Sequence, residues 1–411
     1  MKRIASLFIL AALMLTSCAS SSGGATNLSE GITPQNNTEN ITLGDYTDKL
    51  TDFGVNIFTE SFTGEKNTLI SPLSILYALA MTANGAGDDT LAQMEELFGI
   101  DTETLNACIK AYSAALPNSE KYKLNLANSI WFTADDRFTV NEAFLQTNAD
   151  YYGADIFKAP FDSTTKNDIN NWVKEKTDGM IPKILDEIPT NAVMYLVNAL
   201  AFEAEWQDIY KEDQVRDSIF TTESGDERTV EMMYSDEGVF LEDENATGFI
   251  KYYSGRKYAF ATLLPNEGVS LSDYVGTLTG KTLRDTLTNP TNVTVNTGLP
   301  KFEFEFDTEL TEVLSNMGMR DAFDEDLANL KGLGTSTEGN IFINRVLHKT
   351  YISVGEKGTK AGAATVVEAF DCMSAEPLNN KTVILDRPFL FMLIDTETML
   401  PFFIGSVTDI K

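Results

Sequence analysis

Residues 356–370 combine the composition of a flexible loop with the alternating pattern of a β-strand. Small or apolar side chains occupy every second position from Thr359 to Ala369, whereas the charged residues Lys360 and Glu368 fall between them. Because successive side chains of a strand point to opposite faces, this segment could enter a sheet with its small face against a core and both charges in water. A sequence that suits both a loop and a strand predicts a molecule that switches between two states.

Strands are predicted on both sides of this segment. Residues 348–354 have the pattern of a buried strand before it, and residues 382–385 and 389–394 have the same pattern after it. Short periodic runs are ambiguous by themselves, so an isolated segment of this kind could be a surface loop with chance alternation. Its position inside a β-rich region favours the switching interpretation.

The segment Glu356–Thr365 resembles the hinge of a serpin reactive-centre loop, which runs from an acidic residue through glycine and threonine into small residues. Further stretches in the order typical of the family extend the resemblance over nearly all of residues 44–411. So many motifs in the correct order argue strongly against coincidence. These stretches are residues 67–86, 169–179, 196–206, 299–302, 386–389 and 402–405.

The resemblance implies an α+β serpin fold in a single large domain over residues 44–411. Its main mixed β-sheet would accept the reactive loop, and further β-sheets and about nine helices would surround it. Composition agrees with one compact domain, because the chain has 411 residues, is 43% hydrophobic and contains no linker-like stretch after about residue 43.

In this family the reactive-centre loop, here about residues 356–380, is offered to a protease as a substrate. The resemblance therefore implies an inhibitor and not an enzyme: the target protease is trapped as a covalent acyl-enzyme when the cleaved hinge inserts into the main sheet. The alternative is a non-inhibitory serpin that binds a ligand or client protein at the cell surface. Such members tend to carry bulky or charged residues on the inserting face, and this chain has none there. The hinge residues that carry over are Glu356, Gly358, Thr359, Ala361, Ala363, Ala364 and Thr365.

The spacing usual in the family places the scissile bond between Cys372 and Met373. Cys372 is small and weakly polar, which suits the shallow apolar pocket of elastase-like serine proteases and of some papain-like cysteine proteases. Cleavage after Phe370, Asp371 or Met373 remains open, because counting from the hinge does not fix the bond to a single residue.

Two further groups of residues carry over from the family. A gate where insertion begins is expected at Trp206, Lys301 and Glu356, with a Lys301–Glu356 pair holding the hinge out of the sheet until cleavage. The alternative for this pair is a weak surface ion pair. A polar cluster is expected beneath the opening sheet, where side chains can form new hydrogen bonds when strands part. Its members are Ser71, Ser74, Asn198 and His348.

The N-terminus has the pattern of an exported lipoprotein. A basic start precedes an apolar run from Ile4 to Leu15 that is too short to span a membrane comfortably. Leu15–Cys18 resembles a bacterial lipobox, so residues 1–17 are predicted to be a signal peptide and Cys18 to be lipidated. Residues 18–43 would then be a flexible tether to a membrane at the cell surface. An ordinary signal peptide with a chance cysteine is the alternative.

Composition limits the remaining classes of function. Acidic residues outnumber basic residues 61 to 31, which argues against nucleic-acid partners. Residues 101–117, which match the heparin-binding helix of some serpins, contain one basic residue, Lys110, so no heparin site is expected.

His348 is the only histidine, which leaves no histidine-based metal site and makes a core role for it the better interpretation. We expect a monomer without metal or cofactor and without a disulfide framework. A hydrolase that uses unassigned carboxylates is the remaining alternative.

Overall fold

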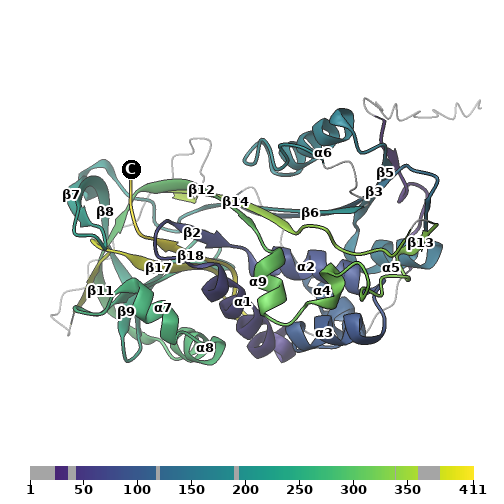
Figure 1. Cartoon of the computed structure of the whole chain (residues 1–411). Coiled ribbons are helices and arrows are strands. Elements are labelled where there is room, and N and C mark those ends of the chain that lie inside the picture. The colour runs from purple at the N-terminus through teal and green to yellow at the C-terminus, as the bar shows by residue number, and fades with distance from the viewer. Residues whose placement is uncertain (1–23, 36–42, 117–120, 189–193, 338, 360–379) are drawn as a thin grey trace, which may run out of the picture.

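The computed structural model describes residues 24–35, 43–116, 121–188, 194–337, 339–359 and 380–411. Within these ranges the chain forms two large β-sheets and a two-stranded one, with helices packed around them (Figure 1). The expectation of a single α+β domain with a main mixed sheet is confirmed.

The main sheet has seven strands within the described ranges. All neighbouring strands are antiparallel except β3 and β5, which are parallel, so the sheet is mixed. In spatial order the strands are β1 (Thr26–Asn27), β5 (Asp155–Ala159), β3 (Tyr122–Thr133), β6 (Met194–Glu205), β15 (Gly358–Thr359), β14 (Leu347–Gly355) and β12 (Phe302–Glu309).

The second sheet contains the two strands predicted after the hinge: residues 382–385 correspond to β16, which ends at Ile384, and residues 389–394 lie in β17. Its spatial order is β16 (Lys381–Ile384), β11 (Thr291–Pro300), β8 (Glu227–Glu242), β9 (Ala246–Tyr252), β10 (Tyr258–Pro265), β17 (Phe389–Asp395), β18 (Leu400–Val407) and β2 (Thr68–Ile70), with β7 (Val215–Thr221) also paired to β8. Strands β4 (Phe138–Val140) and β13 (Gly334–Ser336) form the small sheet.

Nine α-helices occur in the described part of the chain, as expected. Helix α2 is capped by the Ser71 side chain, begins with Pro72 and is buried along its whole length. The helices are α1 (Thr47–Ser61), α2 (Pro72–Ala83), α3 (Asp88–Phe98), α4 (Thr102–Ala115), α5 (Glu142–Tyr152), α6 (Ser163–Lys176), α7 (Leu271–Thr277), α8 (Gly280–Thr288) and α9 (Thr311–Asn316), with 3₁₀ turns at Leu43–Tyr46, Glu212–Gln214 and Asp321–Phe323. None of the helices in the described ranges is long and apolar enough to cross a membrane.

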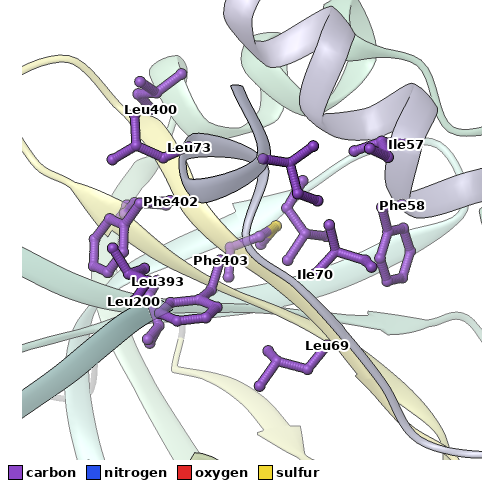
Figure 2. Packing of buried hydrophobic residues seen from close by; sticks show 14 of the residues in the cluster. Ile57, Phe58, Leu69, Ile70, Leu73, Leu200, Leu393, Leu400, Phe402 and Phe403 are labelled. Carbon is purple, nitrogen blue, oxygen red and sulfur yellow. The ribbon is translucent and has the colours of Figure 1, made fainter. Parts of the chain in front are cut away.

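The core lies between the main sheet and strands β17 and β18, both of which are buried on both faces. Ile57 and Phe58 of α1, Leu73 of α2, and Phe402 and Phe403 of β18 all belong to this core (Figure 2). Burying one such side chain stabilises the fold by roughly 1.5–3 kcal/mol. On the opposite face of the main sheet a separate apolar cluster holds α6 against β3 and β6.

Residues 24–35, which we call the N-terminal strap, lie against the domain. Thr26 and Asn27 form β1 on the outer edge of β5, and the Ser29 hydroxyl donates a hydrogen bond to the Ala154 carbonyl. Farther along, the Gln35 amide donates to Asp150 of α5, and Lys110 of α4 donates to the Gln35 carbonyl. The expectation of a free tether over residues 18–43 is therefore wrong for residues 24–35, because an edge strand offers unpaired backbone groups that even a polar segment can bind.

Candidate functional site

The hinge begins inside the main sheet. After β14 the chain turns at Glu356 and Lys357, and the next two residues form β15 between β6 and β14. Gly358 lies opposite Glu205 on one side, and Thr359 lies opposite Ala204 there and opposite Val354 on the other side. A Cβ atom at Gly358, where φ is +154°, would stand 2.0 Å from the Ala204 carbonyl oxygen, so only glycine fits here.

Thr359 is buried, on the face that the alternating pattern assigns to it. Its hydroxyl is hydrogen-bonded to the hydroxyl of Tyr253, which follows strand β9. The Tyr253 ring is stacked on Trp206 with centroids 4.4 Å apart. Burial raises the pKa of Tyr253 well above its usual value, so this hydroxyl stays neutral. The first inserting side chain therefore already has a hydrogen-bond partner beneath the sheet.

The three predicted gate residues meet at the turn between β14 and β15. The indole of Trp206 donates a hydrogen bond to the Gly355 carbonyl at 2.8 Å, and its backbone amide donates to the Lys357 carbonyl at 2.8 Å. Lys301 forms ion pairs with Glu356 and, at 3.0 Å, with Glu231. These contacts fix both sides of the turn.

The ion pair also shifts the titration of both partners. Partial burial is the largest single effect and disfavours the charged form of Glu356. The hydrogen bond from Lys301, a backbone hydrogen bond and the charges of Lys301 and Lys357 together outweigh it and lower the pKa of Glu356. Burial likewise disfavours the charged form of Lys301, but the hydrogen bonds that Lys301 donates to Glu356 and Glu231 and the charges of these two carboxylates together raise its pKa. The Glu356 side chain is 42% exposed, so the pair contributes less than about 1 kcal/mol. The pair forms while Gly358 and Thr359 are already in the sheet, so it does not keep the whole hinge outside.

The polar cluster lies deeper, between β14 and α2. The Ser71 amide donates a hydrogen bond to His348 Nε2 at 3.1 Å, and the Ser71 hydroxyl donates to the Phe402 carbonyl at 3.0 Å. The backbone amide of Ser74 completes the group by donating to the Ser71 hydroxyl. Desolvation lowers the pKa of His348 to about 3, consistent with a neutral ring that accepts at Nε2. Asn198 is paired with Asn128 through the backbone of β6 and β3.

The main sheet is closed at its other end. Leu196 of β6 and Val346, just before β14, form an isolated parallel bridge. Strands β6 and β14 are therefore separated by β15 near Glu205 and come together near Leu196. Insertion of more residues would have to break this bridge.

Several predicted residues lie outside the described part of the chain. These residues are Cys18, Ala361, Ala363, Ala364, Thr365, Cys372 and Met373.

Sequence reasoning missed a buried charge beside the gate. Lys251 of β9 has a side chain that is 2% exposed and forms an ion pair with Glu237 at 2.7 Å. Its ammonium group lies 4.3 Å from the Tyr210 ring centroid and 5.6 Å from that of Trp206. A cation over aromatic faces is a stabilising arrangement. No sequence signal distinguishes this lysine from an ordinary exposed one.

The family is shown by comparison with known proteins. The family model described as "Serpin (serine protease inhibitor)" matches residues 48–410. A leukocyte elastase inhibitor of Homo sapiens is 31% identical over 366 residues, which cover 84% of this chain and 93% of that protein. One of Equus caballus is 30% identical over 360 residues, with the same coverage.

Solved structures of serpins have the same fold as this chain. A crystal structure of the thermophilic serpin tengpin in the native state superposes with a TM-score of 0.88 at 47% identity, covering 94% of this chain and all of that one. The latent state of tengpin gives a TM-score of 0.80 at 45% identity, covering 92% of this chain and all of that one. Because its fold and its sequence agree with those of known serpins, this chain belongs to the serpin family.

Proposed function

We propose that this serpin inhibits elastase-like or other serine proteases, and papain-like cysteine proteases, by a suicide-substrate covalent trap with insertion of the reactive loop. The observation that carries this proposal is β15, because Gly358 and Thr359 already occupy the position where an inserted strand would begin. Relatives described as leukocyte elastase inhibitors support the protease class.

The register of β15 predicts where a longer insertion would lead. Thr359 is opposite Ala204 of β6, so at the same register Ala369 would be opposite Met194, the first residue of that strand. Residue 372 would lie just beyond the strand. A protease attached at Cys372 would thus be carried to the far end of the main sheet.

The same register brings the polar cluster into the mechanism. Thr365 would lie opposite Asn198 on β6 and opposite His348 on β14. His348 points to the interior, and directly opposed residues share a face. The Thr365 hydroxyl would therefore reach a group of polar partners when the strands part. Hydrogen bonds available in both states would lower the cost of opening the sheet.

In the proposed reaction the protease nucleophile attacks the carbonyl of residue 372 and forms an ester or thioester, while the bond to Met373 breaks and the new amine takes a proton. Insertion follows before water attacks the acyl group. The inserted strand forms backbone hydrogen bonds along both edges, which replace contacts with solvent. Movement of the acyl-enzyme to the far end would distort the protease active site and stop deacylation.

A denaturing gel tests the proposal. The purified chain is incubated with elastase-like, trypsin-like, subtilisin-like and papain-like proteases, and products are identified by mass spectrometry. We expect a complex that survives denaturation and a released peptide that starts at Met373. Complete cleavage of the loop by every protease without any such complex would instead favour the non-inhibitory alternative.

We also propose that the protein is a bacterial surface lipoprotein attached through Cys18. The support is the basic and apolar leader followed by the lipobox-like Leu15–Cys18. Cys18→Ala should release the protein from the membrane fraction and leave inhibition by the domain unchanged. Equal membrane retention of this variant would rule out the lipid anchor.

A further inference from the structure

Strands β7 and β8 form a two-stranded ribbon whose outer face is acidic. In an antiparallel pair, directly opposed residues lie on the same face. Along this ribbon Asp217 is opposite Glu231, Ile219 is opposite Thr229, and Thr221 is opposite Glu227. All of these residues are exposed, so the structure defines one continuous solvent-facing surface: Asp217, Ile219, Thr221, Glu227, Thr229 and Glu231.

The basic and acidic side chains of the ribbon lie on different faces. Its two arginines lie on the opposite face: Arg216 is 4.0 Å from the Tyr234 ring centroid, and Arg228 forms an ion pair with Asp409 at 3.0 Å. The outer face has acidic residues and no basic residue of its own. Asp217 lies directly opposite Glu231, an arrangement of like charges that destabilises a strand pair. Lys301, from outside the ribbon, contacts Glu231.

Exposed apolar groups accompany these charges. Ile219 is 44% exposed and Ile209 is 38% exposed, and they are two of the three large apolar residues that are exposed in the described part of the chain. Ile209 also lines a cavity of about 640 Å³ together with Glu212, Val215 and Glu231. An apolar contact next to carboxylates is typical of a surface that binds a cationic protein.

The ribbon borders the segments that flank the reactive loop. Gly355–Gly358 form one wall of the same cavity, so the start of the hinge borders the ribbon. At the other end of β7 the Thr221 amide donates a hydrogen bond to the Asp386 carbonyl, just after β16, where the chain returns from the loop. A protease bound to the loop would therefore stand over this ribbon, which lies at the opposite end of the molecule from β5 and α5 (Figure 1).

We infer that the outer face of the β7–β8 ribbon is a docking surface for a positively charged target protease, an inference that rests on the proposed inhibitory function. Lysine and arginine side chains of the protease would pair with Asp217 and Glu227, and an apolar residue would cover Ile219. The chain's formal charge of −30 would attract such a partner over longer distances. The surface selects among proteases that accept the same loop sequence.

The experiment measures association rates for two elastase-like proteases, one strongly basic and one near neutral. The test variant is Asp217→Asn with Glu227→Gln. Its control is Glu325→Gln with Asp326→Asn, which removes two exposed charges from the loop 324–327 next to α3. We expect the test variant to slow association with the basic protease by about fivefold at low salt and to have little effect at high salt. Neither variant should change the rate with the neutral protease.

Three further outcomes are informative. Ile219→Ser should slow association with the basic protease about twofold at every salt concentration, since apolar contact is not screened. Equal slowing by the test and control variants would show general attraction by net charge and would overturn the docking surface. If no covalent complex forms with any protease, the proposed inhibition fails, whereas binding to the basic protease with its nucleophile replaced by alanine still tests the surface.

Discussion

The hydroxyl groups of Thr359 and Tyr253 are hydrogen-bonded to each other beneath the main sheet. This bond joins the hinge to the aromatic pair formed by Tyr253 and Trp206. A buried hydroxyl that loses its partner costs about 1–3 kcal/mol. The bond should therefore contribute a measurable part of the free energy that holds Thr359 in the sheet.

A double-mutant cycle tests this bond. Tyr253→Phe and Thr359→Ala should each lower the free energy of unfolding of the intact protein by about 1 kcal/mol. The double variant should lose less than the sum, because the second change no longer leaves a hydroxyl unpaired. Denaturant titration of the four proteins measures the coupling. Strictly additive effects would mean that the two hydroxyls do not interact in solution.

A charge at the start of the hinge should convert the inhibitor into a substrate. Thr359→Arg places a cation in a position that is 2% exposed, and burying an unpaired charge costs several kcal/mol. We expect the target protease to cleave the loop without forming a stable complex. Thr359→Ser is the matched control and should inhibit normally. Complex formation by the arginine variant at the wild-type ratio would contradict the assignment of this face.

Cleavage of the loop should stabilise the protein. After a cut between Ala369 and Met373 the hinge can complete the strand that β15 begins. Each new backbone hydrogen bond contributes about 1 kcal/mol net. We expect the melting temperature to rise by at least about 10 °C. Calorimetry of intact and cleaved protein measures this, and identical melting temperatures would favour the non-inhibitory alternative.

His348 should make stability depend on pH. The pKa of this buried ring is lowered to about 3, whereas an unfolded histidine titrates near 6.5. The unfolded chain therefore binds a proton that the folded chain does not, so stability is complete above about pH 6.5 and falls as the pH decreases toward 3. Between pH 6.5 and 5 the loss should reach about 2 kcal/mol.

The variant His348→Gln isolates this contribution from that of the carboxylates. The free energy of unfolding should fall less steeply between pH 7 and pH 5 in the variant than in the wild type. Denaturant titrations at several pH values give both slopes. Equal slopes would mean that the histidine is not buried in its neutral form.

A change at the predicted scissile bond should change specificity. Cys372→Arg supplies a side chain that forms charge-assisted hydrogen bonds in the acidic pocket of trypsin-like enzymes. Inhibition of trypsin should appear and inhibition of elastase-like enzymes should fall, while the hinge still inserts. Phe370→Arg is the control for register, because cleavage there shortens the insertion and should yield cleaved product. Efficient trypsin inhibition by Phe370→Arg alone would move the scissile bond by two residues.

Local pattern and family motifs predicted which residues meet at the start of the hinge. Alternation placed Thr359 on the buried face, and the motifs brought Trp206, Lys301 and Glu356 to one turn. The role of Tyr253 could not be predicted, because its partner is distant in sequence and nothing local distinguishes it from Tyr252. Contacts set by tertiary packing leave no periodic signal.

Two other features of the structure could not be predicted from the sequence for the same reason. The pairing of Gly358 and Thr359 with β6 and β14 depends on strands whose spacing a loop-compatible sequence does not specify. The strap lies within residues 18–43, which were expected to be a flexible tether because that tract is polar. Its binding rests on backbone pairing with β5 and on side chains of α4 and α5.

The docking of Thr26–Asn27 determines where the chain leaves the domain. Strand β5 pairs with Ser129–Thr133, the half of β3 farthest from the hinge. Residues 19–23 alone separate Gly24 from Cys18, a reach of at most about 20 Å. With a lipid on Cys18, the β5 end of the domain would lie nearest the bilayer, and the end that carries the hinge would face away from it. In the proposed reaction, each trapped protease would then move from the end that faces away from the membrane to the end nearest the membrane.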